Sequence, residues 1–242
     1  MSAPMEKIRS RGYWKVVVRP TTFAEKRVLD KETLDHILRT TSVSLRGWSF
    51  PHVDDIIELD SGTDWIGQEI EYGRFHELWR FYQSGQFVHY SGMIEDWVDN
   101  STGQWLPPNG EYRRVNLDVR DVVAQFTEVF EFAARLSFTE AGDSGTRVEV
   151  VAGNIDNHFL VLPSRPGKAS WIPEARKPSM AYATELSNAG LVAEKRDLAL
   201  KASMEFFRCF NWDPNIELLR DLQLGVLSRG PLKPLGHFIS RN

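Results

Sequence analysis

The sequence predicts an α+β fold, in which a mostly antiparallel sheet packs against a long amphipathic helix and further helices follow at the C-terminal end. Short β-branched and aromatic segments cluster in the first hundred residues, and apolar residues then recur at helical spacing over residues 117–140. Strands and helices are grouped along the chain. This grouping favours an α+β domain over a doubly wound parallel sheet, in which they would alternate.

The first elements follow from local composition. Residues 12–20 (GYWKVVVRP) are β-branched and end at a proline, which predicts a strand. Asp30 is expected to cap a helix over residues 31–43, because Leu34, Ile37 and Leu38 then share one face. Extended structure is expected next in residues 46–59, 65–73, 76–82 and 86–92.

Residues 80–90 (RFYQSGQFVHY) indicate a hairpin. Ser84-Gly85 suits a two-residue type I′ turn, with residues 78–83 paired antiparallel to residues 86–91. Opposed residues share a face, and faces alternate along each strand. The predicted core face carries Trp79, Phe81, Val88 and Tyr90, and the other face carries Leu78, Arg80, Tyr82, Phe87, His89 and Ser91.

The helix over residues 117–140 is expected to be one-sided. Its apolar positions recur every three or four residues, which is typical of a helix with one face on a core. Before it, Trp105 is expected to anchor the polar connection over residues 99–116. The helix is expected to turn Phe126, Phe130 and Ala133 inward and Glu128, Glu131 and Arg135 outward.

The C-terminal third continues with a predicted hairpin of residues 146–154 and 157–164, and then a proline-containing loop over residues 163–179. Helices are expected over residues 193–210 and 213–227, the second with Asp213 as its cap and Pro214 at its first position. The predicted division is an α+β main domain, 1–165, and a C-terminal helical part, 166–242, packed on the same core.

Composition limits the function classes. The formal net charge of -4 argues against a general nucleic-acid coat but leaves room for a local basic patch. The single cysteine, Cys209, cannot form an internal disulfide and is expected to be buried, which fits a reducing cytoplasm. The chain shows no apolar signal segment near residue 1 and no run long enough for a membrane span. We therefore expect a cytoplasmic protein with no membrane partner.

The second face of the predicted hairpin is the candidate binding site. Arg80, Tyr82, Phe87 and His89 combine positive charge with stacking surfaces, which suits a nucleotide, a nucleic acid or another anion. Arg46 and His52, in the segment SLRGWSFPHVDD, are expected beside it, where Gly47 permits a positive φ. The structural alternative is that Arg80 pairs with Glu69 or Glu71 and that the aromatic residues form a second packing layer.

Two other functions stay open. Acidic residues are dense over residues 54–77, where Glu69 and Glu71 share a strand face, and a metal-dependent hydrolase or nuclease needs such carboxylates. The surplus of aromatic residues also fits a protein-interaction module. No dinucleotide, nucleophile-elbow or zincin motif is complete, so no catalytic residue or cofactor is assigned.

The segments GYWKVVVRP, LRGWSFPH and WRFYQSGQFVHY together resemble an uncharacterised bacterial domain associated with Schlafen-related DNA- or ATP-binding proteins. The resemblance covers residues 12–97 and carries no catalytic residues that can be transferred. It implies a prokaryotic, cytoplasmic setting with a regulatory or defence role. The leading hypothesis from the sequence is a non-enzymatic cytoplasmic binding or regulatory module.

Overall fold

The computed structural model describes residues 3–98, 115–162 and 172–228. Seven strands form one antiparallel sheet in the order β2-β3-β4-β5-β1-β7-β9, and β6 and β8 form a separate parallel pair. The fold is therefore α+β with a mostly antiparallel sheet, as predicted. The strands are β1 (Tyr13–Pro20), β2 (Asp60–Ser61), β3 (Trp65–Tyr72), β4 (Phe75–Tyr82), β5 (Phe87–Gly92), β6 (Val115–Asp118), β7 (Gly145–Gly153), β8 (His158–Val161) and β9 (Ser179–Ser187).

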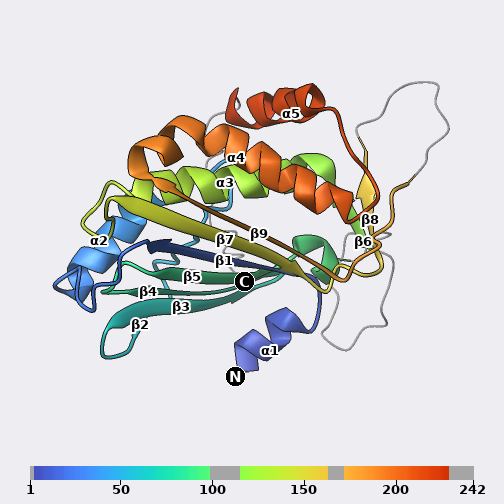
Figure 1. Cartoon of the computed structure of the whole chain (residues 1–242). Coiled ribbons are helices and arrows are strands. Elements are labelled where there is room, and N and C mark those ends of the chain that lie inside the picture. The colour runs from blue at the N-terminus through green and yellow to red at the C-terminus, as the bar shows by residue number, and fades with distance from the viewer. Residues whose placement is uncertain (1–2, 99–114, 163–171, 229–242) are drawn as a thin grey trace.

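The helices cover the two faces of the sheet unequally. α3 and α4 lie along one face, with α5 packed outside them, and α1 lies on the other side near one end (Figure 1). We call the side under α3 and α4 the inner face and the opposite side the outer face. The helices are α1 (Ala3–Arg9), α2 (Lys31–Thr41), the short 3-10 helix η1 (Ile94–Trp97), α3 (Val119–Leu136), α4 (Asn188–Arg208) and α5 (Ile216–Ser228).

The first predicted elements are confirmed. β1 alternates buried and partly buried residues, as expected for a strand with one face on the core. The Asp30 side chain accepts a hydrogen bond from the backbone N–H of Thr33 at 2.7 Å, which fixes the start of α2. Residues 46–59, in contrast, are irregular apart from the bridge between Val43 and Phe50. The prediction of extended structure in this segment is therefore wrong.

The long helix is more deeply buried than its pattern predicts. Phe126, Phe130 and Ala133 face the core and Arg135 is exposed, as expected. Glu128 and Glu131 are buried, so their predicted outward position is wrong. The reason is that α3 is covered both by the sheet and by α4, so few of its sides reach solvent. Glu131 bonds Lys195 of α4 at 2.8 Å, and Glu128 bonds the segment before β2.

The β4–β5 hairpin is confirmed, but its predicted register is wrong by one residue. The loop has three residues, 83–85, because the Tyr82 N–H donates to the Gln86 carbonyl at 2.9 Å and Gly85 adopts a φ of 86°. Phe81 therefore pairs with Phe87, and Trp79 with His89. A shift of one residue turns every side chain of a strand to the other face. Phe87, His89 and Ser91 thus lie on the inner face, and the half-buried Val88 and Tyr90 lie on the outer face.

Two further predictions about the C-terminal third are wrong. β7 pairs with β1 and β9, whereas β8 pairs with β6, so residues 146–154 and 157–164 do not form a hairpin. The described part of the expected loop, residues 172–178, lies in no helix or named strand, but the edge strand β9 that follows it was not predicted. α5 begins at Ile216 and is capped by Asn215, whose side chain accepts from the Glu217 N–H at 2.8 Å, instead of by Asp213.

The core joins the two predicted parts of the chain. One cluster of buried side chains includes Trp14 of β1, Phe126 of α3 and Phe206 of α4, and β9 belongs to the same sheet as β1. The domain division at residues 165 and 166 stays a prediction. Cys209 is buried, as expected. The role predicted for Trp105 falls outside the described residues.

Candidate functional site

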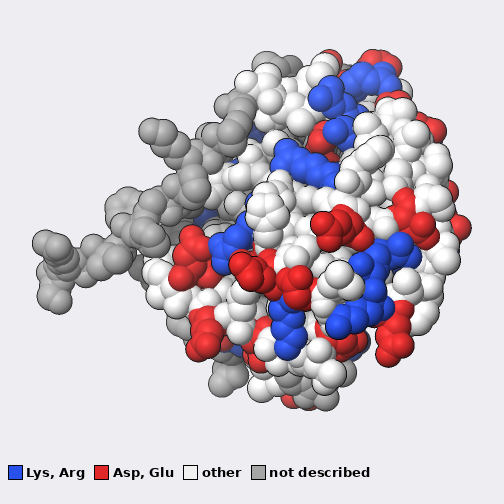
Figure 2. Space-filling view, turned by 90° about the vertical axis from the view of Figure 1, so that its left-hand side faces the viewer, with Lys and Arg blue, Asp and Glu red and all other residues white. Residues whose placement is uncertain are grey.

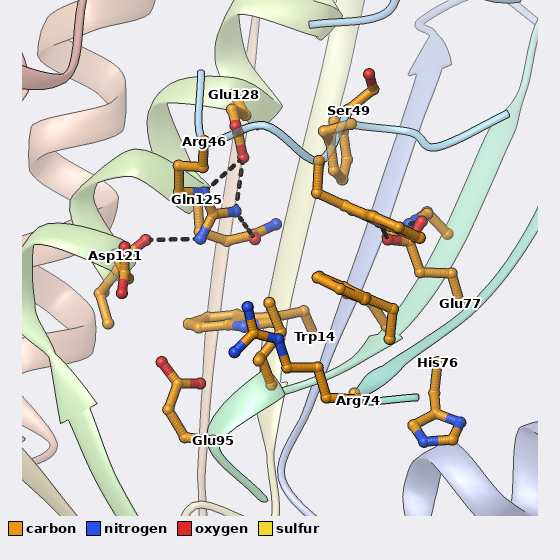
Figure 3. Close-up of a pocket in the computed structure, with 18 of the residues that line it drawn as sticks. Trp14, Arg46, Ser49, Arg74, His76, Glu77, Glu95, Asp121, Gln125 and Glu128 are labelled. Carbon is orange, nitrogen blue, oxygen red and sulfur yellow. Dashed lines mark hydrogen bonds and ion pairs between the residues drawn. The ribbon is translucent and has the colours of Figure 1, made fainter. Parts of the chain in front are cut away.

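A cavity of about 350 Å³ lies between the inner face of the sheet and the first half of α3, beneath residues 44–50. Strand, helix and irregular segment each contribute a wall, so its lining comes from positions far apart in the sequence (Figure 3). Aromatic rings and charged groups dominate this lining. The aromatic residues are Trp14, Trp48, Phe50 and Phe75, and the charged residues are Arg46, Arg74, Glu77, Glu95, Asp121 and Glu128.

The wall on α3 is built around an ion pair. Arg46 Nη2 lies 2.6 Å from Glu128 Oε2 and 2.6 Å from Gln125 Oε1, and the Leu45 N–H donates to Glu128 Oε1 at 3.2 Å. The Glu128 side chain is fully buried. Burial raises its pKa, and the charge and hydrogen bonds of Arg46 oppose that effect. Through these bonds Arg46 attaches residues 44–50 to α3.

The opposite wall is an aromatic stack. The Trp48 ring lies 3.8 Å from the ring of His52 and 3.8 Å from that of Phe75, at interplanar angles of 22° and 5°. Two rings this close to one indole lie on its opposite faces. Trp48 Nε1 donates to the carboxylate of Glu77, and Glu77 Oε2 lies 3.0 Å from His89 Nε2. Gly47, next to Trp48, has a φ of 85°, so the positive φ expected there is confirmed.

His89 and His52 have different surroundings in this wall. His89 is 1% exposed, and its Nδ1 has no hydrogen-bond partner among the described residues. His52 is partly buried, and burial lowers its pKa, although Glu77 and two aspartates act in the opposite direction.

The third wall carries carboxylates that lack a cationic partner. Glu95 projects from η1 and Asp121 from the first turn of α3, on the same side of the cavity in Figure 3. In residues 3–98, 115–162 and 172–228, neither carboxylate lies within ion-pair distance of a cationic side chain. Burial raises the pKa of Glu95 to about 7; the Asp121 charge adds to this increase and the Arg46 charge opposes it.

The six residues predicted as one site are divided between the two faces of the sheet. Arg46 and His89 line the cavity on the inner face, and His52 stacks on Trp48, which is part of the same lining. Phe87 is buried in the core. Arg80 and Tyr82 lie on the outer face, half-buried. The register shift explains this division, because it moved Phe87 and His89 away from Arg80 and Tyr82.

The outer face carries cations over aromatic rings. The Arg80 guanidinium lies 4.4 Å from the Trp65 ring centroid, above Gly67, where any side chain would crowd both groups. Lys15 lies 5.9 Å from the Tyr90 ring. The ion pair of Arg80 with Glu69 or Glu71, which was the structural alternative to a binding site, is not among those of the described residues, and Glu71 pairs with Lys7. At the end of the molecule that holds α2 and the β4–β5 loop, acidic and basic side chains are interspersed (Figure 2).

The metal alternative finds little support in the described part of the chain. Glu69 and Glu71 share a strand face, as expected, but both are exposed to solvent. No three His, Cys, Asp or Glu side chains within the described ranges are placed to hold a metal ion. Glu77, at the end of the acidic stretch, is instead bonded to Trp48 and His89.

Sequence reasoning missed most of the cavity lining, including Trp14, Phe75, Glu95 and Gln125. One signal was present. Asp121, Gln125 and Glu128 follow one another at spacings of four and three residues, which places three polar side chains in a stripe along a mostly apolar helix. Such a stripe indicates that one side of the helix meets polar partners or a cavity.

Comparisons with protein-family models, with curated proteins and with solved structures found no significant match for this chain. Among the helices that the structure describes, none combines the length and apolar character needed to cross a bilayer.

Proposed function

We propose that this chain is a non-enzymatic binding module whose ligand site is the cavity between the sheet and α3. The observation that carries the proposal is a cavity of about 350 Å³ that combines aromatic walls with six charged side chains, three of which are bonded to other residues of the lining. Pockets for small molecules are typically concave, mostly apolar, and of roughly 300–1,000 Å³. In the α3 wall Arg46 bonds Glu128, and in the aromatic wall Glu77 bonds Trp48 and His89. The polar groups available to a ligand are therefore those of the third wall.

The contacts of His89 favour binding over nucleophilic catalysis. Its Nε2 bonds Glu77, and no hydroxyl or thiol in the described residues hydrogen-bonds to its ring. An activated Ser, Cys or Thr nucleophile needs a base within about 2.6–3.2 Å. These contacts favour a role for Glu77 and His89 in holding Trp48 over a role in a catalytic triad.

Native mass spectrometry of freshly purified protein tests the proposal. Ser91 lines the cavity, so Ser91→Phe should fill it, whereas Val88→Phe adds the same ring to the outer face. We expect a small molecule that is retained by the wild type and by Val88→Phe and lost from Ser91→Phe. Equal retention by both variants would place the ligand elsewhere. If no ligand is retained and no compound in a thermal-shift panel binds in a Ser91→Phe-sensitive way, the proposal fails.

A second candidate function is binding of single-stranded nucleic acid on the outer face, and the nucleotide and nucleic-acid hypothesis rests there. Trp65, Tyr82, Tyr90 and Tyr13 are partly exposed along neighbouring strands. Lys15, Arg19 and Arg80 lie among them and make no ion pair within the described ranges. Bases of a single strand stack on aromatic rings while cations contact the phosphates.

Anisotropy of a labelled single-stranded oligonucleotide tests this second candidate. Arg80→Ala should weaken binding and lower the slope of log affinity against log salt by about 0.7, the single-strand value for one phosphate contact. Arg220→Ala, on the helical side, removes the same charge and should change nothing. Equal effects of the two variants, or no binding at low salt, would remove this candidate and favour the protein-interaction alternative. The bacterial and cytoplasmic setting stays a prediction.

A further inference from the structure

We propose that the ligand of the cavity carries a cationic group, an ammonium or a guanidinium, which lies between Glu95 and Asp121 while its apolar body packs against Trp14 and Phe75. This inference rests on the proposed function, because it names the ligand class of the same site.

Four of the six charged side chains around the cavity are acidic. Arg46 is satisfied by Glu128, by the Gln125 side chain and by the backbone carbonyl of Asp121 at 3.2 Å. Glu77 is satisfied by Trp48 and His89. Within the described ranges, the charged groups of the lining that make no ion pair are therefore two carboxylates, Glu95 and Asp121, and one guanidinium, Arg74.

Arg74 does not neutralise these carboxylates. Its side chain is exposed, and its guanidinium carbon lies 5.3 Å from the centroid of the Phe75 ring. It makes no ion pair in the part of the chain that the structure describes. Asp121 is exposed and Glu95 is partly buried, so an anionic ligand at the third wall would meet two like charges. A cationic ligand meets complementary charge on the third wall.

The surroundings of Glu95 support a cation at this position. A partly buried carboxyl that makes no ion pair among the described residues holds its proton more strongly. Burial and the charges of Asp121 and Asp96 raise the pKa of Glu95 to about 7, although a backbone hydrogen bond and the charge of Arg46 oppose this increase. A bound cation favours the ionised form. Binding should therefore release a proton from Glu95 and tighten as the pH rises past 7.

The aromatic lining completes the recognition. Trp14 lies beneath Arg46 in Figure 3, and Phe75, which also lines the cavity, lies beside Arg74. The negative faces of aromatic rings attract ammonium and guanidinium groups within about 6 Å. The rest of the ligand then needs a compact apolar body, because the cavity of about 350 Å³ is near the lower limit for small-molecule sites.

Two probes of matched shape and opposite charge test the inference: phenethylamine and 3-phenylpropionate, measured by ligand-observed NMR or calorimetry. We expect the amine to bind at least about tenfold more tightly at pH 8. Its affinity should fall by about tenfold at pH 6, because a carboxyl of pKa about 7 is mostly ionised at pH 8 and mostly protonated at pH 6.

Three variants separate the contribution of charge to the affinity for the amine from the contribution of packing. Glu95→Gln should lower the affinity for the amine about tenfold at pH 8 and remove its pH dependence, and Asp121→Asn should weaken binding while leaving that dependence. Glu69→Gln, an exposed acid of the outer face, should change neither. Tighter binding of phenylpropionate, blocked by Ser91→Phe, would overturn the cation inference and leave the proposed function intact. Binding of neither probe, or an amine affinity that Glu95→Gln does not change, would also overturn it.

Discussion

The two faces of the sheet handle charge in different ways, although the same strands supply both. On the inner face, Glu77 of β4 and Glu128 of the covering helix α3 are buried, and each is held by several donors. On the outer face, Arg80 and Lys15 lie over aromatic rings with no carboxylate partner in the described ranges. Helices that exclude water from one face make unpaired charge costly there, whereas solvent tolerates it on the other.

The strongest test of this contrast places a charge under the helices. Phe130 of α3 is fully buried, whereas Phe138, just beyond the end of α3, is 66% exposed. Phe130→Asp should prevent soluble folding, because an unpaired carboxylate would be buried among apolar side chains. Phe138→Asp should leave soluble yield and melting temperature nearly unchanged. If Phe130→Asp were soluble with an unchanged melting temperature, that side of α3 would not be core.

A smaller effect is expected from truncating neighbours that face opposite sides of the sheet. Phe81 is fully buried on the inner face, and Tyr82, the next residue, is half-buried on the outer face. Phe81→Ala should lower the free energy of unfolding by about 3–5 kcal/mol, and Tyr82→Ala by about 1 kcal/mol or less. Urea denaturation measures both. Similar losses for the two variants would mean that the outer face is covered in solution.

Burial of Phe81 was predictable from the sequence, and the partners of Phe81 were not. Alternation along residues 78–83 identifies the face of each β4 residue, because that depends only on the strand period. The faces of β5 depend on the number of loop residues. Ser84-Gly85 suits a two-residue turn, yet the chain uses a three-residue loop with Gly85 as its left-handed residue. One residue of loop length therefore separated Phe87 and His89 from Arg80 and Tyr82.

The fold class was predictable for a similar reason, and the cavity was not. Periodicity and caps such as Asp30 are local, and they placed β1, α2 and most of α3. The cavity brings Trp14, Trp48, Glu95 and Gln125 together from four separate elements. No local sequence pattern predicts that these four residues are neighbours, because their proximity depends on the order of the strands in the sheet. The parallel pairing of β6 with β8 is non-local in the same way.

Two glycines with positive φ test the register directly. Gly85 ends the β4–β5 loop, and a Cβ there would overlap the carbonyl oxygen of Ala141. Gly73 joins β3 to β4 with a φ of 56°, and a Cβ there would meet nothing within 4 Å. Gly73→Ala should cost about 1–2 kcal/mol, the left-handed penalty alone. Gly85→Ala should cost at least about 1 kcal/mol more in urea denaturation. Equal costs would contradict the three-residue loop.

The last contrast concerns two acids on opposite faces, Glu95 and Glu69. Glu95 lines the cavity with a pKa raised from the ordinary 4.5 to about 7, mainly by burial, whereas Glu69 is exposed. A carboxyl with a raised pKa binds its proton more tightly in the folded state than in the unfolded state. It therefore makes the folded state less stable, relative to a neutral residue, as the pH rises from about 4.5 through about 7.

Glu95→Gln removes this dependence. The variant should match the wild type near pH 4.5 and exceed its free energy of unfolding by about 1–3 kcal/mol at pH 8, where the wild type must bury an ionised carboxylate. Glu69→Gln makes the same substitution at an exposed position of the outer face and is the matched control. The measurement is urea denaturation at pH 4.5, 6 and 8. A constant difference between Glu95→Gln and the wild type would show that Glu95 titrates as an ordinary surface acid. The third wall of the cavity would then be open to water, and a bound cation would gain little from it.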